Sequence, residues 1–247
     1  MWALRRREQK RVSALPLFYF LLFLYTIFVM KNNYNAIIFD CDGVVINSCF
    51  HYFISWKRIF DEEGVPFTMV DFQMKVSGGT REAVFRKVMG DLSAEKLKEL
   101  SNRKQKIFEQ LVAIDPPQPF PEITELLEFL REKNIKLAIT SSSKNAYATL
   151  TRTNLLAFFD VIVTPHNAPD ATTDAELFRT TMKQLKKSPK ECIVIEDSPT
   201  SIREAKELGA FVVGLSVIVS PEGLKDADAV ALNIKELRSV LVRLCGL

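Results

Sequence analysis

The chain has 247 residues, of which 47% are hydrophobic and 26% are charged, so its composition is that of a globular protein and not of a disordered or fibrous one. The net charge is +3, but residues 1–30 alone carry +4, and +3 minus +4 leaves −1 for the remainder. A nearly neutral body has no electrostatic footprint for nucleic acid, so we expect no nucleic-acid partner. No pattern in the chain predicts an oligomeric state.

The N-terminal residues 1–33 form a separate apolar segment. Within it, residues 14–30 carry no charge and follow a run of arginines. A membrane anchor needs about 17–25 apolar residues, so this stretch is long enough to be one. The alternative is that translation starts at Met30 and that residues 1–29 are an upstream extension.

The cysteines bear on location. Their spacing matches neither a metal site nor a disulfide framework, and it suits a reducing compartment. The four are Cys41, Cys49, Cys192 and Cys245. We therefore expect a cytoplasmic protein, with membrane anchoring through residues 14–30 as the alternative.

A short apolar strand, residues 36–39, leads directly into two aspartates. A strand that is apolar on both faces is typical of the centre of a parallel sheet. Side chains two residues apart on an extended chain point the same way, so we expect Asp40 and Asp42 to face together, with Gly43 turning the backbone behind them. Paired carboxylates repel, and a divalent cation or a shared proton relieves the repulsion. On its own, the pattern also fits an ordinary polar turn.

Residues 47–117 predict a block of about four helices, because apolar residues recur there at helical spacing. Thr80 and Ser93 are the expected N-caps of the last two. Prolines at 116, 117 and 119 then act as a stiff hinge. We expect a cap domain that excludes water from the aspartates, and the alternative is an insertion that only packs. The expected helices cover residues 47–63, 70–76, 81–89 and 94–114.

From residue 118 onward, strands and helices alternate, which predicts an α/β fold with a parallel sheet. Residues 34–46 plus 118–247 form the expected core. The expected strands are 136–140, 159–164, 192–195, 211–215 and 229–232. The expected helices are 121–133, one ending near 153, 174–187, one from Pro199 to a C-terminal Gly209, and 234–244.

Polar clusters end three of the expected strands: Asp40 with Asp42, Ser141, and Glu196 with Asp197. In a parallel sheet such strand ends lie at one edge, where ligands bind. Ser141 and the amides that begin the next helix could hold phosphate oxygens. Each cluster alone fits a cap or a turn, but their recurrence predicts one shared site.

These motifs resemble those of the haloacid dehalogenase superfamily, close to its β-phosphoglucomutase and phosphoglycolate phosphatase branch, over about residues 34–246. The first motif matches Asp40-Cys41-Asp42-Gly43-Val44, the second Ser141 and the fourth Glu196-Asp197-Ser198. The resemblance implies a Rossmann-like parallel-sheet core with an inserted helical cap, and Mg²⁺ as the cofactor.

The resemblance also implies roles for the matched residues. Asp40 is then the nucleophile that forms an aspartyl phosphate, and Asp42 is the general acid and base. Asp40 and Asp197 bind Mg²⁺, with the backbone carbonyl of Asp42 as a further ligand and Glu196 in support. Ser141 grips the transferring phosphoryl group.

Substrate phosphate contacts of the mutase branch fall on Ser143, Lys144, Asn145 and the cap residue Arg81. The simpler interpretation of Arg81 is a solvated residue at a helix start.

Two positions depart from the family pattern. The lysine of the third motif falls on Thr172, and its usual proline falls on Thr173, although Glu176-Leu177-Phe178 match the helix that follows. Lys144, Arg179 and His166 are candidates to replace that charge. The second departure is Tyr52, where this branch often has a histidine.

We therefore expect a Mg²⁺-dependent phosphatase of a small phosphorylated metabolite, such as a sugar phosphate, acting through phospho-Asp40. One alternative is a mutase of the β-phosphoglucomutase type. The other is a catalytically weakened binding protein on the same fold, because Thr172 replaces the lysine.

Overall fold

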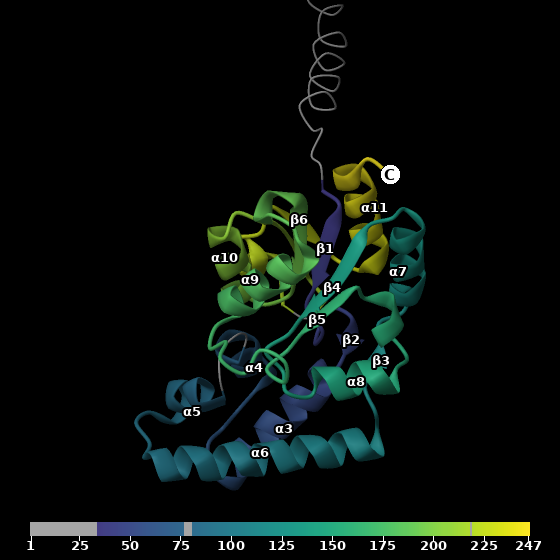
Figure 1. The fold of residues 1–247 in the computed structure, drawn as a ribbon. Coiled ribbons are helices and arrows are strands. Elements are labelled where there is room, and N and C mark those ends of the chain that lie inside the picture. Colours follow the sequence, from purple (N-terminus) through teal and green to yellow (C-terminus); the bar gives the residue numbers. More distant parts are fainter. Residues whose placement is uncertain (1–33, 77–80, 218) are drawn as a thin grey trace, which may run out of the picture.

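The computed structural model describes residues 34–76, 81–217 and 219–247 (Figure 1). The expected anchor at 14–30, the alternative start at Met30 and the expected cap Thr80 lie outside these residues. Among the helices within them, none combines the length and the apolar character needed to cross a bilayer.

A six-stranded parallel sheet forms the centre of the fold, in the order β5-β4-β1-β6-β7-β8. This confirms the expected α/β class. The strands are β1 (Ala36–Phe39), β4 (Lys136–Thr140), β5 (Val161–Val163), β6 (Cys192–Glu196), β7 (Phe211–Leu215) and β8 (Ala229–Ala231). The first motif, which follows β1, lies at the middle of the sheet, because β1 pairs with β4 on one side and β6 on the other.

Helices cover both faces of the sheet, which is why β1 is apolar throughout. Ile37 and Phe39 pack with α7 (Ile123–Glu132) and α11 (Ile234–Cys245). Ala36 and Ile38 pack on the opposite face with α9 (Asp174–Leu185) and α10 (Pro199–Glu207). All four side chains are fully buried, and each large one contributes roughly 1.5–3 kcal/mol.

The remaining core elements are α8 (Ala146–Arg152) and three short 3₁₀ helices at Leu156–Phe158, Pro189–Glu191 and Pro221–Leu224. Most boundaries agree with the sequence within a few residues. The helix expected from Pro121 begins instead at Ile123, because Glu122 has a φ of 62° in the left-handed region, which ends helical geometry on its N-terminal side.

The described residues between 49 and 114 form a helical block of four helices, α3 (Cys49–Glu62), α4 (Met69–Lys75), α5 (Arg81–Met89) and α6 (Ala94–Ile114). The block has its own apolar cluster, centred on Trp56, Phe60 and Phe85. In Figure 1, α3, α5 and α6 lie beyond the end of the sheet at which β1 runs out. Ser93 caps α6 as expected, since its hydroxyl accepts a hydrogen bond from the amide of Lys96 at 3.2 Å.

The two connections between the sheet and the helical block pair with each other. β2 (Ile46–Asn47) and β3 (Gln118–Pro119) form a small antiparallel ladder that the sequence does not predict. Two-residue strands have no periodicity to detect. This ladder holds the entry and the exit of the block side by side, next to the strand end that carries Asp42.

Candidate active site

Backbone pairing brings the three polar strand ends to the same level. Phe39 lies opposite Ile139 on β4 and opposite Ile195 on β6. The amide of Asp40 then donates to the carbonyl of Ile195 at 3.0 Å, so the chain stays paired for one residue past the strand. Asp40 therefore leaves the sheet between the ends of β4 and β6.

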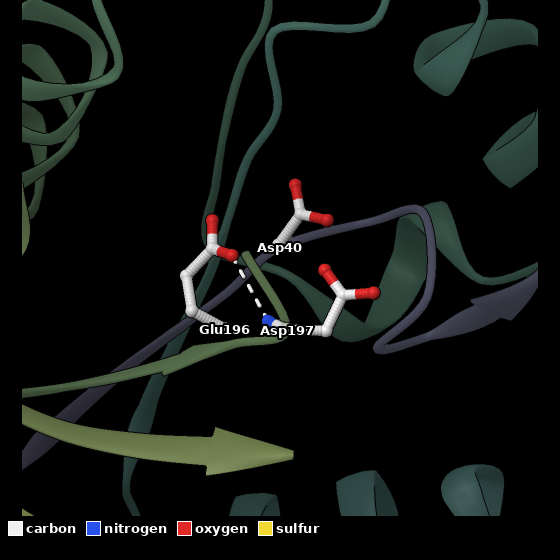
Figure 2. A group of neighbouring side chains, drawn as sticks. All are labelled: Asp40, Glu196 and Asp197. Carbon is white, nitrogen blue, oxygen red and sulfur yellow. Dashed lines mark hydrogen bonds between the residues drawn. The ribbon is translucent and has the colours of Figure 1, made fainter. Parts of the chain in front are cut away.

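Three carboxylates gather at this edge. Asp40, Glu196 and Asp197 each offer an oxygen, and these atoms all lie within 4.8 Å of one another. Figure 2 shows the three side chains around a common space. Glu196 is held in place because one of its oxygens accepts from the amides of Asp197 and Ser198, both at 3.0 Å, which leaves its other oxygen free of those bonds.

Gly43 makes room for this cluster. Its φ is +91°, a conformation that L side chains rarely adopt. A Cβ at this position would lie 2.1 Å from Oδ2 of Asp197. The glycine of the first motif is therefore required both for the turn and for the approach of the Asp197 carboxylate.

The ionised forms of these three carboxyl groups are strongly disfavoured. Burial raises the pKa of Asp40 well above its usual value, and the charges of Glu196, Asp197 and Asp42 raise it further. Burial likewise raises the pKa of Glu196, to which Asp197 and Asp174 add. Burial and the charge of Asp42 raise the pKa of Asp197 to about 7. A cation placed among these groups would reverse each of these shifts.

The residues present fit a magnesium ion. Mg²⁺ prefers oxygen ligands and is commonly held by one or two carboxylates, with substrate phosphate and water completing its shell. Asp40, Glu196 and Asp197 supply such oxygens within the required spacing. The side chain of Asp42 is not a member of this cluster, so its expected part as a ligand falls to its backbone carbonyl and stays a prediction.

Asp42 has a different environment. Ser48, in the connection to the helical block, donates to its Oδ1 at 2.6 Å, and Tyr52 of α3 donates to its Oδ2 at 3.2 Å. Burial raises the pKa of Asp42, while these hydroxyls and the charge of Lys104 oppose the rise. Asp42 is thus set apart from the cluster as a hydrogen-bonded carboxyl group, which suits proton transfer.

The loop after β4 lies across from Asp42. Ser141 is buried, and its hydroxyl accepts from the amide of Ser143 at 3.2 Å. Ser143 in turn bonds the Tyr52 hydroxyl at 2.8 Å. The side-chain oxygen of Asn145 accepts from Gln105 of α6 at 3.0 Å. This loop therefore contacts the helical block at two points.

Two other expected site residues, Lys144 and Arg81, are not part of the carboxylate cluster. Lys144 is exposed on the same loop. Arg81 starts α5, and its guanidinium reaches the carbonyl of Ser101 on α6 at 3.4 Å. Its charge also lowers the pKa of Lys104.

Thr172 is exposed and is engaged in capping α9. Its amide and hydroxyl both donate to Glu176, at 2.6 and 3.1 Å. Arg179 and His166, two of the candidate replacements for the missing lysine, are also exposed. The neighbour that faces Glu196 from the start of α9 is an acid, Asp174, which adds negative charge where the family pattern places a lysine nearby.

Lys104 is a site residue that sequence reasoning missed. It is 2% exposed, and its ammonium lies over the rings of Tyr52, Trp56 and Phe108 at 4.6, 5.0 and 5.0 Å from their centroids. Burial, followed by the charge of Arg81, lowers its pKa to about 7. Lys104 lies between Arg103 and Lys106 on a charged helix, so the sequence holds no signal that separates it from solvated lysines.

The contacts of Ser48 and Tyr52 with Asp42 were also missed. Tyr52 is noticeable in the sequence only as a departure from the family pattern. Its contact depends on how the helical block sits against the sheet.

Known proteins resemble this chain over most of its length. The model of the haloacid dehalogenase-like hydrolase family matches residues 37–215. The β-phosphoglucomutase of Bacillus subtilis is 32% identical over 188 residues, which cover 73% of this chain and 83% of that protein. The phosphorylated carbohydrates phosphatase of Thermotoga maritima is 30% identical over 217 residues, which cover 84% of this chain and 98% of that protein.

A solved structure has the same fold. The β-phosphoglucomutase of Clostridium difficile superimposes with a TM-score of 0.73 at 24% identity, over 85% of this chain and 96% of that one. At this identity the likeness concerns the fold alone.

Proposed function

Because this chain belongs to the haloacid dehalogenase-like hydrolases, we propose that it is a Mg²⁺-dependent phosphatase of a small phosphorylated metabolite, such as a sugar phosphate. Its relatives include phosphatases and a phosphoglucomutase, and the chain is accordingly a phosphohydrolase or phosphotransferase. The observation that carries the proposal is the carboxylate cluster of Asp40, Glu196 and Asp197, with Asp42 held separately beside it.

In the first half of the proposed reaction, a carboxylate oxygen of Asp40 attacks phosphorus. The bond from phosphorus to the ester oxygen breaks, and the electron pair stays on that oxygen. Asp42, protonated at this stage, gives its proton to the same oxygen. The products are an aspartyl phosphate on Asp40 and a free alcohol.

In the second half, water attacks the phosphorus of the aspartyl phosphate. Its proton passes to the ionised Asp42, and the bond between phosphorus and the Asp40 oxygen breaks. Inorganic phosphate leaves, and both aspartates return to their starting states. Asp42 therefore needs a pKa near neutrality, and the rise caused by burial moves it in that direction.

Asp40, Glu196 and Asp197 would hold Mg²⁺. The ion would supply positive charge beside the carboxylates and the phosphoryl oxygens. Ser141 and the amides that follow it would bind those oxygens from the neighbouring strand end. The helical block would act as the cap that excludes water, as residues 47–117 predict.

A substrate panel tests this function. The protein is incubated with sugar phosphates and other phosphate esters, with Mg²⁺ or with a chelator, and released phosphate is measured. We expect Mg²⁺-dependent release that falls below about 10⁻⁴ of wild type in Asp40→Asn, because the nucleophile is lost. Asp170→Asn, at an exposed position, is the control for the loss of one acid. Full activity in Asp40→Asn would contradict the assignment of Asp40 as the nucleophile.

The second candidate is a phosphosugar mutase, favoured by the 32% identity with the Bacillus subtilis enzyme. Ser143, Lys144, Asn145 and Arg81 would then hold the second phosphate of a bisphosphate. A mutase interconverts hexose 1- and 6-phosphates when primed with bisphosphate. Phosphate release without such isomerisation supports the phosphatase instead.

A further inference from the structure

Tyr52 links the helical block to two parts of the candidate active site. It belongs to α3, yet its hydroxyl lies 3.2 Å from Oδ2 of Asp42 and 2.8 Å from Oγ of Ser143. Asp42 follows β1, and Ser143 follows β4. A single atom of the block therefore touches both the proposed acid and the proposed phosphate-binding loop.

The number of protons on the Tyr52 hydroxyl decides which group donates in each of its two hydrogen bonds. The Tyr52 hydroxyl carries one proton, which it donates to Oδ2 of Asp42. Ser143 therefore donates to Tyr52. Ser143 accepts in turn from the amide of Asn145 at 3.2 Å. The result is a chain of donors that runs from the loop after β4, through the block, to Asp42.

The Tyr52 ring is fixed from α6. The ring of Phe108 packs on it with centroids 4.5 Å apart. The ammonium of Lys104 lies 4.6 Å from the ring centroid. Among the hydrogen bonds and ion pairs of the described residues, the Lys104 ammonium has no partner of its own, so the ring faces are its main contacts.

We propose that Tyr52 is a positioning residue that orients the carboxyl group of Asp42 for proton transfer to the leaving oxygen. The inference rests on the proposed phosphatase function. Ser48 holds one carboxyl oxygen of Asp42 and Tyr52 holds the other, so the two hydroxyls together fix the plane of the group. Without Tyr52, Oδ2 loses this donor, and the Ser143 hydroxyl, whose hydrogen bond also lowers the pKa of Asp42, is left without the tyrosine that holds it in place.

The need for this orientation depends on the substrate. An alkoxide is a poor leaving group and requires a proton from Asp42, whereas p-nitrophenolate is a good one and leaves without a proton. Tyr52 thus matters for esters of alcohols, such as sugar phosphates, and matters little for p-nitrophenyl phosphate. The residue would then be one that adapts this site to alkyl phosphates.

The test compares wild type and Tyr52→Phe on two substrates, a sugar phosphate that wild type hydrolyses and p-nitrophenyl phosphate. Asp42 also serves the second half-reaction, which both substrates share, so the comparison uses kcat/KM, which reports the steps up to formation of the aspartyl phosphate. We expect kcat/KM on the sugar phosphate to fall by about 10–10²-fold. We expect kcat/KM on p-nitrophenyl phosphate to stay within about threefold. Ser48→Ala, which removes the other hydroxyl, should show the same dependence on the leaving group.

Tyr147→Phe is the matched control, because it removes the hydroxyl of a tyrosine that is 47% exposed. Equal losses on both substrates, or no loss on either, would overturn the role of Tyr52. Activity that does not depend on Asp40 would instead overturn the proposed function. A crystal structure of Tyr52→Phe gives a readout without turnover: we expect the Asp42 carboxyl group to rotate, and an unchanged orientation contradicts the proposal.

Discussion

The strand ends and the helical block each bury charge, but of opposite sign and with different compensation. At the strand ends, burial raises the pKa values of Asp40, Glu196 and Asp197, and neighbouring carboxylates raise them further. In the block, Lys104 is buried among three aromatic rings, and its pKa falls to about 7. Ring faces attract a cation, at about 0.5–2 kcal/mol each, so the lysine is partly stabilised where it lies. The carboxylates accept hydrogen bonds from backbone amides, but burial and the neighbouring charges outweigh these bonds.

The difference separates a site that requires a ligand from one that does not. Burial and repulsion oppose the ionisation of three close carboxylates, and a cation among them would favour it, as expected for a metal site. The lysine already has its partners, and its charge reaches Asp42 across the Tyr52 ring. We therefore assign the carboxylates at the strand ends to metal binding. The lysine instead packs inside the helical block beside Asp42.

The largest effect should follow from removing one carboxylate of the cluster. We expect Asp197→Asn to lower kcat/KM by about 10³-fold, because the metal loses a ligand and the transition state loses charge stabilisation. The same change should raise the free energy of unfolding without Mg²⁺, since repulsion is relieved. Kinetics and chemical denaturation with and without Mg²⁺ measure both. Asp170→Asn is the exposed control, and a variant that loses both activity and metal-free stability would argue for a purely structural role.

The next effect concerns the lysine that the family pattern places at the position of Thr172. Thr172→Lys places a positive charge near Glu176 and the start of α9, and we expect turnover to rise by about 10²-fold. Arg179→Ala should then have little effect, because Arg179 is exposed. Values of kcat/KM for the two variants check this. If Arg179→Ala or Lys144→Ala abolishes activity while Thr172→Lys does nothing, the missing charge is already replaced.

The last effect is on stability and not on turnover, and it lies in the helical block. The folded pKa of Lys104 is about 7 and the ordinary value is 10.5, so between these pH values the unfolded chain binds more protons. Stability should therefore rise with pH across this window and be lowest below pH 7. Lys104→Met should stabilise the protein at pH 7 by about 2–4 kcal/mol and remove the slope.

Denaturation curves between pH 6 and 10 measure this effect. Lys106→Met, at the exposed neighbour on α6, serves as the control. If Lys104→Met destabilises the protein at every pH, the ring contacts outweigh the cost of burial.

The sheet and the strand-end cluster were predictable from the sequence for the same reason. The apolar run of β1 predicts a central strand. Parallel pairing of that strand with β6 then places Asp40 beside Glu196. The bounds of α6 agree with the sequence because Ser93 and the prolines mark its two ends. Local signals were sufficient in each case.

The contacts between the block and the sheet were not predictable. The approach of Tyr52 to Asp42 depends on the angle at which α3 leaves the small β2–β3 ladder, and two-residue strands carry no pattern. Lys104 was missed because burial of a lysine depends on the rings around it and not on its neighbours along the chain. The left-handed Glu122 was missed because a glutamate gives no local signal for positive φ.

The most direct test of the strand-end cluster is a Mg²⁺ titration followed by thermal unfolding of the wild-type protein. Binding to the folded state alone should stabilise it by about 2.7 kcal/mol at a hundred times Kd. The shift in Tm should be larger at pH 8 than at pH 6, because protons compete for carboxylates whose pKa values are raised. Asp197→Asn should lose most of the shift. A wild-type Tm that does not respond to Mg²⁺ at either pH would contradict the assignment of this cluster as a metal site.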